Sequence, residues 1–156
     1  MIHLAVPLRN TKLYSDLKNN VITPSEFTYG CSNLPTDQYS VNYLSLPRLH
    51  KFKFIKLIEK IFSRYSKVGF CFEFYQTTKT QLNKEQIIFC INDAISLGAL
   101  FAKMFGLIDN KVIATFQCLS ERRIKYFRYN FILNFFIRKL LLKADKIVVL
   151  SEIAKV

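Results

Sequence analysis

Polar side chains follow three short apolar runs of the chain, at positions where they could contact a ligand. Asp93 closes the first run, Gln117 the second and Ser151 the third. A carboxylate accepts hydrogen bonds, whereas an amide and a hydroxyl both donate and accept them. Gln117 could therefore contact a sugar hydroxyl or an amide of a ligand. Arg122 and Arg123 follow near the start of a predicted helix, where their guanidinium groups could grip a phosphate.

Each of these residues also has a purely structural interpretation. Asp93 stands at the start of a helical segment, where acidic residues commonly cap the helix. Gln117 could merely end a strand, although residues in strand-end loops often carry function. Ser151 is of a type that caps helices more often than it acts as a nucleophile, and no histidine base accompanies it. Arg122 and Arg123 could be solvated surface residues.

Apolar runs alternate with helical patterns in the second half of the chain. Short apolar runs between helices are typical of parallel strands buried on both faces. We therefore predict an α/β fold, with an open, mostly parallel, Rossmann-like sheet and helices on both faces. The predicted strands are Ile87–Ile91, Val112–Phe116 and Ile147–Leu150, and the predicted helices are Ala94–Phe105 and Ser120–Lys143.

The carboxyl ends of these strands are the predicted location of a site. In an open parallel sheet, ligands bind beyond these ends, where loops and helix N-termini gather. This rule predicts a place and not a reaction. The residues expected there are Pro7–Asn10, Asn92–Asp93, Gln117–Glu121 and Ser151–Glu152.

The first half of the chain supplies further predicted elements. Ile2–Val6 is an apolar run that ends at Pro7, as a first strand would. Polar and apolar residues alternate over Tyr39–Leu46, which predicts a second strand. Lys51–Lys67 has apolar residues at spacings of three and four, which predicts an amphipathic helix. Val68–Tyr75 fits either a strand with alternating aromatic residues or a continued helix.

The two helices of the second half differ in character. Ala94–Phe105 is rich in small residues, which predicts close packing on the sheet, and Asp93 is the expected N-cap. The last helix mixes basic and aromatic residues, the composition of a helix that lies in a membrane interface. Its apolar residues form two stripes, and we expect burial against protein rather than a bilayer surface. The stripes are Ile124, Phe131, Phe135 and Leu142, and Tyr129, Leu133, Phe136 and Leu140.

Composition points to one domain with an anionic partner. The 156 residues are 51% hydrophobic, enough for a core, and carry a formal net charge of +12. Acidic lipids, phosphorylated substrates and nucleic acid are the usual anionic partners, although the lysines could simply be solvated. Nucleic acid is the weakest of these, because the aromatic residues lie in apolar runs rather than on a stacking platform.

Several classes of site and segment are not predicted. Cys31, Cys71, Cys90 and Cys118 are scattered and only two histidines are present, so we expect no metal site and reduced thiols typical of the cytoplasm. The loop after the first strand lacks glycine, which argues against dinucleotide and P-loop sites, and we expect no cofactor. We recognise neither a secretory leader nor a segment apolar enough to span a membrane.

Residues Gln86–Glu152 together resemble the N-terminal, acceptor-side domain of GT-B fold glycosyltransferases, family 4 in particular. In that family a strand ends in a His-Asp or similar pair, and a later segment reads alanine-aspartate-x-isoleucine-valine-x-x-serine. Gln117 stands where the family usually has histidine, and the family's glycine-rich loop after the first strand is absent. The matching residues here are Asn92-Asp93, Ala144-Asp145, Ile147-Val148 and Ser151.

The resemblance implies retaining transfer of a sugar from a nucleotide-sugar donor to a carbohydrate or lipid-linked acceptor. It also implies that residues 1–156 form one Rossmann-like domain, that a C-terminal donor-binding domain is absent, and that the chain alone is inactive. Asp93, Gln117 and Ser151 would line the acceptor side of the cleft. The protein would be cytoplasmic or peripheral at the inner face of the cell membrane. The alternative is a non-catalytic, basic module that binds an anionic membrane surface or another partner.

Overall fold

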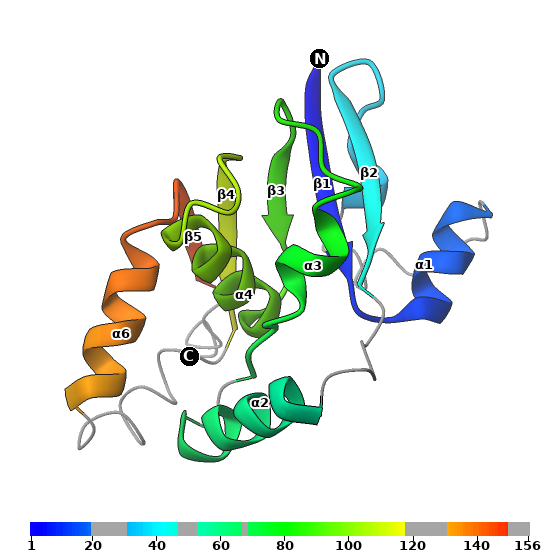
Figure 1. The fold of residues 1–156 in the computed structure, drawn as a ribbon. Coiled ribbons are helices and arrows are strands. Elements are labelled where there is room, and N and C mark those ends of the chain that lie inside the picture. The colour runs from blue at the N-terminus through cyan, green and yellow to red at the C-terminus, as the bar shows by residue number, and fades with distance from the viewer. Residues whose placement is uncertain (20–30, 47–52, 67–68, 118–130, 150–156) are drawn as a thin grey trace, which may run out of the picture.

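The computed structural model describes residues 1–19, 31–46, 53–66, 69–117 and 131–149. Five parallel strands form one sheet in the order β2-β1-β3-β4-β5, which confirms the predicted open α/β fold (Figure 1). The strands are β1 (Ile2–Leu8), β2 (Tyr39–Ser45), β3 (Ile87–Cys90), β4 (Val112–Phe116) and β5 (Lys146–Val149). The helices are α1 (Thr11–Lys18), the short 3-10 helix η2 (Cys31–Asn33), α2 (Lys53–Ser66), α3 (Phe74–Thr78), α4 (Asp93–Met104) and α6 (Phe131–Leu141).

Strand β1 runs through Pro7 instead of ending before it. Leu46 N–H donates to Leu8 O over 2.9 Å, so the backbone of Leu8 faces β2. Successive residues of a strand direct their backbone groups to opposite neighbours, so the nitrogen of Pro7 faces the β3 side. Proline has no N–H group to donate to β3, and the pairing of β1 with β3 ends at Ala5 opposite Ile88. The proline therefore opens the sheet next to β3 without ending β1.

The strand order places helices on both sides of the sheet. The chain moves from β1 to β2 in one direction across the sheet and from β3 to β4 in the other. Right-handed crossovers then put α1 on one face and α4 on the opposite one. Figure 1 shows α4 and α3 in front of the sheet, and α4 contacts both β3 and β4. The core on the α4 side contains the fully buried Ile88, Cys90, Val112 and Ala114.

Burial on both faces, which the apolar runs predict, holds only for part of the sheet. Alternate residues such as Ile87, Phe89 and Ile113 are half-buried, because they belong to the face away from α4. Strand β5 is largely exposed, with Ile147 and Val149 both above 40% exposure. The prediction of two-sided burial is therefore wrong for β5, because among the described residues β5 is the last strand of the sheet and pairs only with β4.

Small residues let α4 approach its neighbours closely, as predicted. The hydroxyl of Ser96 accepts from Thr115 N–H over 3.1 Å and donates to Thr115 O over 2.9 Å, so it bonds directly to β4. A Cβ atom added to Gly98 would lie only 2.3 Å from the backbone oxygen of Cys71. Only glycine fits there, because any side chain would collide with that carbonyl. The segment around Cys71 therefore lies directly on α4.

Residues 69–73, just before α3, form neither the strand nor the continued helix considered from the sequence. Cys71 N–H donates to Ala94 O over 3.1 Å, which attaches this segment to the first turn of α4. Phe70 and Phe72 stack at 4.1 Å between ring centroids, and both meet Phe101 of α4 edge to face. Phe62 of α2 joins the same cluster. The aromatic alternation thus serves helix packing and not a strand.

Helix α6 places only one of its two predicted apolar stripes against the core. Leu140 is buried, and Leu133 and Phe136 pack partly buried against the core cluster. The other stripe is exposed at Phe131 and Phe135, so the expectation of burial against protein is wrong for that stripe. The reason is geometric: α6 packs beside α4 on one side only. Residues 118–130, including the predicted start of this helix, lie outside the described residues. None of the described helices is long and apolar enough to cross a membrane.

Asp145 joins the amino ends of β4 and β5 to the end of α4. Its Oδ2 accepts from Val112 N–H over 2.7 Å and from Lys103 Nζ, while its own N–H donates to Val112 O over 3.0 Å. Burial raises the pKa of Asp145, but the hydrogen bonds from Lys103 and Val112 and the charge of Lys103 outweigh it, so the pKa lies below its ordinary value. Asp145, one of the residues on which the family resemblance rests, therefore has a structural role. It lies at the amino ends of the strands, opposite the predicted site at their carboxyl ends.

Replacing Gly98 with alanine tests the contact between α4 and Cys71. At an ordinary helix position this change raises stability by about 0.5–1 kcal/mol. Here the added methyl group collides with the Cys71 carbonyl, and we expect Gly98→Ala to lower the free energy of unfolding by about 1–3 kcal/mol. Urea unfolding followed by circular dichroism measures the difference. A stabilised variant would show that α4 and Cys71 lie farther apart.

The lowered pKa of Asp145 predicts a pH-dependent contribution to stability. A depressed folded-state pKa stabilises the fold above the unfolded value of 3.8, and the contribution disappears as the pH falls through the lower folded value. Asp145→Asn should therefore be less stable than the parent chain at neutral pH, and the gap should close below about pH 3.8. Urea unfolding at several pH values measures the gap. A gap that does not change with pH would contradict this role.

Candidate functional site

The strand order identifies one position on the carboxyl edge of the sheet as the candidate site. The chain leaves β1 toward β2 and leaves β3 toward β4, so the crossover connections diverge between β1 and β3. Ligands of open α/β proteins bind at such a divergence, beyond the carboxyl ends of the strands. Arg9 and Asn10 follow β1 there, Asn92 and Asp93 follow β3, and Gln117 follows β4.

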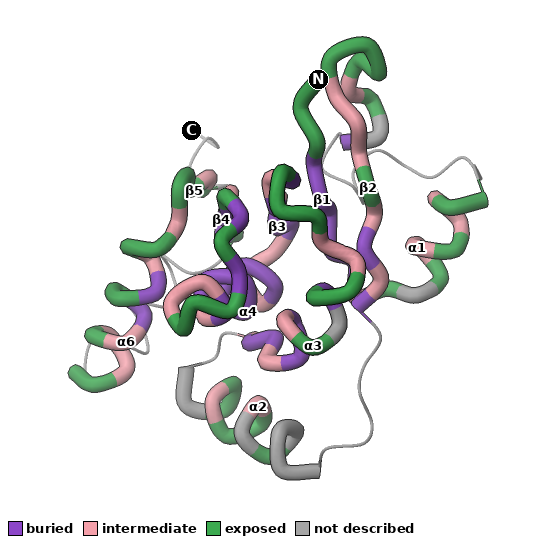
Figure 2. Tube along the Cα trace, turned by 45° about the horizontal axis from the view of Figure 1, so that its top comes forward, coloured by how far each residue is buried: buried purple, intermediate pink, exposed green. Residues whose placement is uncertain are grey.

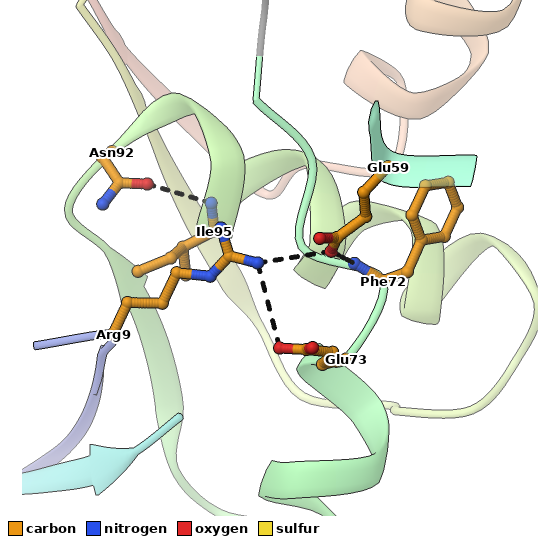
Figure 3. Close-up of polar contacts among 6 residues, drawn as sticks. All are labelled: Arg9, Glu59, Phe72, Glu73, Asn92 and Ile95. Atoms are coloured by element: carbon orange, nitrogen blue, oxygen red, sulfur yellow. Dashed lines mark hydrogen bonds and ion pairs between the residues drawn. The ribbon is translucent and has the colours of Figure 1, made fainter. Parts of the chain in front are cut away.

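An ion cluster, which we call the Arg9 clamp (Arg9, Glu59 and Glu73), occupies this position. Arg9 Nη2 donates to Glu59 Oε1 over 3.2 Å and lies 3.9 Å from Glu73 Oε2 (Figure 3). The same Glu59 oxygen accepts from Phe72 N–H over 3.1 Å. Glu73 is 4% exposed, and the Glu59 and Arg9 side chains are mostly buried. The clamp thus ties the loop after β1 to α2 and to the segment that precedes α3.

The clamp combines one positive and two negative groups. Burying a carboxylate requires a partner charge or hydrogen bonds, which Arg9 and the backbone N–H of Phe72 provide for Glu59. The Nε of Arg9 is buried and has no hydrogen-bond partner in the part of the chain that the structure describes.

Asparagine side chains cap α1 and α4, which follow β1 and β3 at this edge. The Oδ1 of Asn10 accepts from Lys12 and Leu13 N–H at the start of α1. The Oδ1 of Asn92 accepts from Ile95 N–H over 3.0 Å and is the N-cap of α4 (Figure 3). The expectation that Asp93 caps α4 is therefore wrong. Asn92 has the extended backbone that a cap requires, and this makes Asp93 the first residue of the helix.

Asp93 instead connects the ends of β3 and β4. Its Oδ1 accepts from Gln117 N–H over 2.6 Å. The carboxylate also lies in the first turn of α4, where the helix dipole favours negative charge, as the sequence predicts. This bond uses the backbone N–H of Gln117 and does not involve the side-chain amide of that residue. Gln117 is exposed. The structure thus brings two predicted site residues together.

Three predicted site residues cannot be compared with this geometry. Ser151, Arg122 and Arg123 lie outside the described residues. Of the clamp residues, the sequence predicts only Arg9 near the site, as part of Pro7–Asn10, and it predicts neither Glu59 nor Glu73 there. Arg9 lies within the predicted strand-end loop, so its position was available from the pattern. Glu59 lies within an amphipathic helix and Glu73 within the ambiguous aromatic segment, and neither carries a local signal of pairing with Arg9.

The thiols near this edge are held in the protonated form. Burial raises the pKa of Cys71 to about 11, although the positive charge of Arg9 opposes the shift. Burial also raises the pKa of Cys90 and of Cys31 above the ordinary thiol value. A protonated thiol is a poor nucleophile and a poor metal ligand at neutral pH. The three cysteines therefore act as small apolar core residues, as the sequence predicts for Cys90.

Hydrogen bonding to a polar ligand is the chemistry that this arrangement supports. The edge offers a carboxylate and an exposed amide from Asp93 and Gln117, together with the Arg9 clamp. Within the described ranges, no three His, Cys, Asp or Glu side chains gather closely enough to hold a metal ion. A hollow of about 210 Å³ lies at the opposite, amino edge, between the segments that precede β3 and β4. Its wall includes Lys79, Lys84 and Asn110, and it contains none of the predicted site residues.

Replacing Glu59 tests whether the Arg9 clamp holds α2 to the carboxyl edge. Glu59→Gln keeps the shape of the side chain but removes the charge that pairs with Arg9, so we expect the free energy of unfolding to fall by about 1–3 kcal/mol. Urea unfolding measures the change. Glu85→Gln is the matched control, because Glu85 is exposed and its replacement should change stability by less than about 0.5 kcal/mol. Equal effects of the two changes would show that the clamp does not stabilise the fold.

Comparisons with known proteins add no further assignment to this geometry. Neither the protein-family models, nor the curated proteins, nor the solved structures yielded a match to the chain.

Proposed function

We propose that this chain is the acceptor-side domain of a glycosyltransferase and binds a glycan or lipid-linked sugar at the carboxyl edge of its sheet. The hydrogen bond from Gln117 N–H to Asp93 is the observation that carries this proposal. It joins two strand ends at the edge where ligands of parallel sheets bind, and it leaves an exposed amide beside a carboxylate. Paired amide and carboxylate groups suit sugar hydroxyls, which donate and accept hydrogen bonds.

Two further features support the same proposal. The open, all-parallel sheet is of the Rossmann-like type that the resemblance to GT-B N-terminal domains implies. The alanine-aspartate-x-isoleucine-valine residues of the resemblance have a structural role. Asp145 bonds to Val112 of β4 and to Lys103 of α4, and Ile147 and Val148 lie in β5, which pairs with β4. In this proposal a separate domain binds the nucleotide-sugar donor, and the acceptor lies over Asp93 and Gln117. The reaction would take place in the cytoplasm, at the inner face of the membrane when the acceptor is a lipid.

Mapping saccharide binding on the chain tests the proposal. We expect short oligosaccharides and lipid-linked sugar analogues, titrated into isotope-labelled protein, to shift the amide resonances of Asn92, Asp93 and Gln117. Gln117→Ala should weaken the binding roughly threefold to tenfold, the loss of about one hydrogen bond, with unchanged circular dichroism. Lys84→Ala, at the amino-edge hollow, is the control and should leave the affinity unchanged. Shifts confined to the amino edge would place the ligand elsewhere and contradict the proposal.

A basic, non-catalytic interaction module is the second candidate function. The net charge of +12 and the exposed apolar residues of α6 favour it. The saccharide titration separates the two candidates, because a module of this kind has no reason to bind sugars at Asp93 and Gln117.

A further inference from the structure

Helix α6 exposes a row of large apolar side chains, which we call the α6 outer face (Phe131, Ile132, Phe135 and Leu142). Their exposures are 83%, 80%, 54% and 77% in that order. Leu142 is the first residue after α6. At 100° per residue the four side chains fall within an arc of about 100° around the helix axis. Isolated exposed apolar residues are ordinary, but a contiguous set on one helix face marks a surface that binds something.

The orientation of α6 is determined by its opposite side. Ile137 and Leu140 are buried, and Phe136 meets Phe101 of α4 and Phe62 of α2 at about 6 Å between ring centroids. These contacts prevent the helix from turning its outer face toward the core. Figure 2 shows α6 at the margin of the molecule with exposed segments along its length. The outer face therefore faces away from the core.

Cationic side chains border this face, and acidic ones are missing from it. At 100° per residue Arg138 lies just outside the apolar row and Lys139 lies within it, between Phe135 and Ile132. Lys143 and Lys146 follow the helix, and all four basic residues are exposed. Lys139 Nζ lies 5.4 Å from the centre of the Phe135 ring, so a cation and an aromatic ring of the face are adjacent. The sequence contains no aspartate or glutamate between positions 131 and 144. A second copy of the chain would bring the same positive charge to this face, which disfavours self-association.

We propose that the α6 outer face docks onto an anionic lipid surface. Apolar side chains flanked by Lys and Arg are the pattern of a helix that lies in the membrane interface, with its apolar side among the acyl chains and its cations at acidic headgroups. Long basic side chains can extend their charge to the headgroups from beside the apolar row. The helix would lie parallel to the bilayer and would not cross it. This inference stands apart from sugar binding, because it uses none of the residues at the carboxyl edge.

Vesicle co-sedimentation of the full chain tests the docking surface. We expect binding to vesicles of phosphatidylcholine with about a third phosphatidylglycerol and much weaker binding to pure phosphatidylcholine, with a loss of binding as salt rises. The double change Phe131→Ser and Phe135→Ser should lower the partition coefficient about tenfold or more, since both rings leave the lipid phase. Arg138→Gln with Lys139→Gln should lower it on acidic vesicles only.

The matched control removes an exposed apolar pair from another helix. Leu57 and Ile61 of α2 are exposed and four residues apart, as Phe131 and Phe135 are. Leu57→Ser with Ile61→Ser should leave vesicle binding unchanged. Circular dichroism and the thermal midpoint of each variant report whether it is folded. Equal binding of the parent chain and the folded Phe131/Phe135 variant, or loss of binding only in the α2 variant, would overturn the proposal. So would a stable dimer that the Phe131/Phe135 variant abolishes, because the face would then bind a second copy.

Discussion

The close contact between Gly98 of α4 and the backbone of Cys71 is the constraint on which the candidate site depends. The missing side chain at Gly98 lets residues 69–73 lie on α4, where Cys71 N–H donates to Ala94 O. That position brings Phe72 and Glu73 to the carboxyl edge of the sheet. There the N–H of Phe72 bonds to Glu59, and both glutamates meet Arg9. One glycine in a helix thus permits the polar cluster at the end of β1.

The amino and carboxyl ends of the strands carry different polar contacts. At the amino edge, Asp145 joins β5 to β4 and to Lys103, and Asn110 donates its side-chain N–H groups to the loop before β3. At the carboxyl edge, Asp93 bonds to the backbone of Gln117 and the Arg9 clamp closes the space between β1 and α2. The residues that carry the family resemblance therefore lie at both ends of the strands, with Asp93 at the carboxyl ends and Asp145 at the amino ends. Asp145 preserves the fold, whereas Asp93 and Gln117 stand where a ligand would bind.

The sequence predicts most of the architecture because the buried strands appear as continuous apolar runs and the helices as apolar residues spaced three and four apart. The runs that become β3 and β4 are apolar without interruption, and the small residues of α4 indicate close packing. The failures arise where tertiary context decides. Burial of β5 depends on whether the strand has a second neighbour, and an apolar run does not contain that information. Asn92 and Asp93 are both good caps, and the backbone conformation alone selects Asn92.

The site was partly predictable for a related reason. Strand ends follow from the apolar runs of the sequence, which therefore place Asp93 and Gln117 at one end of the sheet, where the structure joins them by a hydrogen bond. The Arg9 clamp joins residues fifty and more positions apart, and nothing local to Glu59 or Glu73 indicates a partner. The orientation of α6 likewise depends on packing. Its two apolar stripes are equivalent in the sequence, and contacts with Phe62 and Phe101 determine which one faces the core.

Hydrogen exchange at Cys71 and Phe72 is the most direct test of this account. The Cys71 amide bonds to Ala94 O of α4, and the Phe72 amide bonds to Glu59 Oε1 of α2, so the two amides report the position of residues 69–73 against both helices. The account predicts that they exchange slowly, with protection approaching that of Ile88 in the sheet, whose N–H donates to Lys111 O. Exchange at the rate of an unstructured chain, while Ile88 remains protected, would contradict it. The carboxyl edge would then lack the segment that carries Glu73 to Arg9.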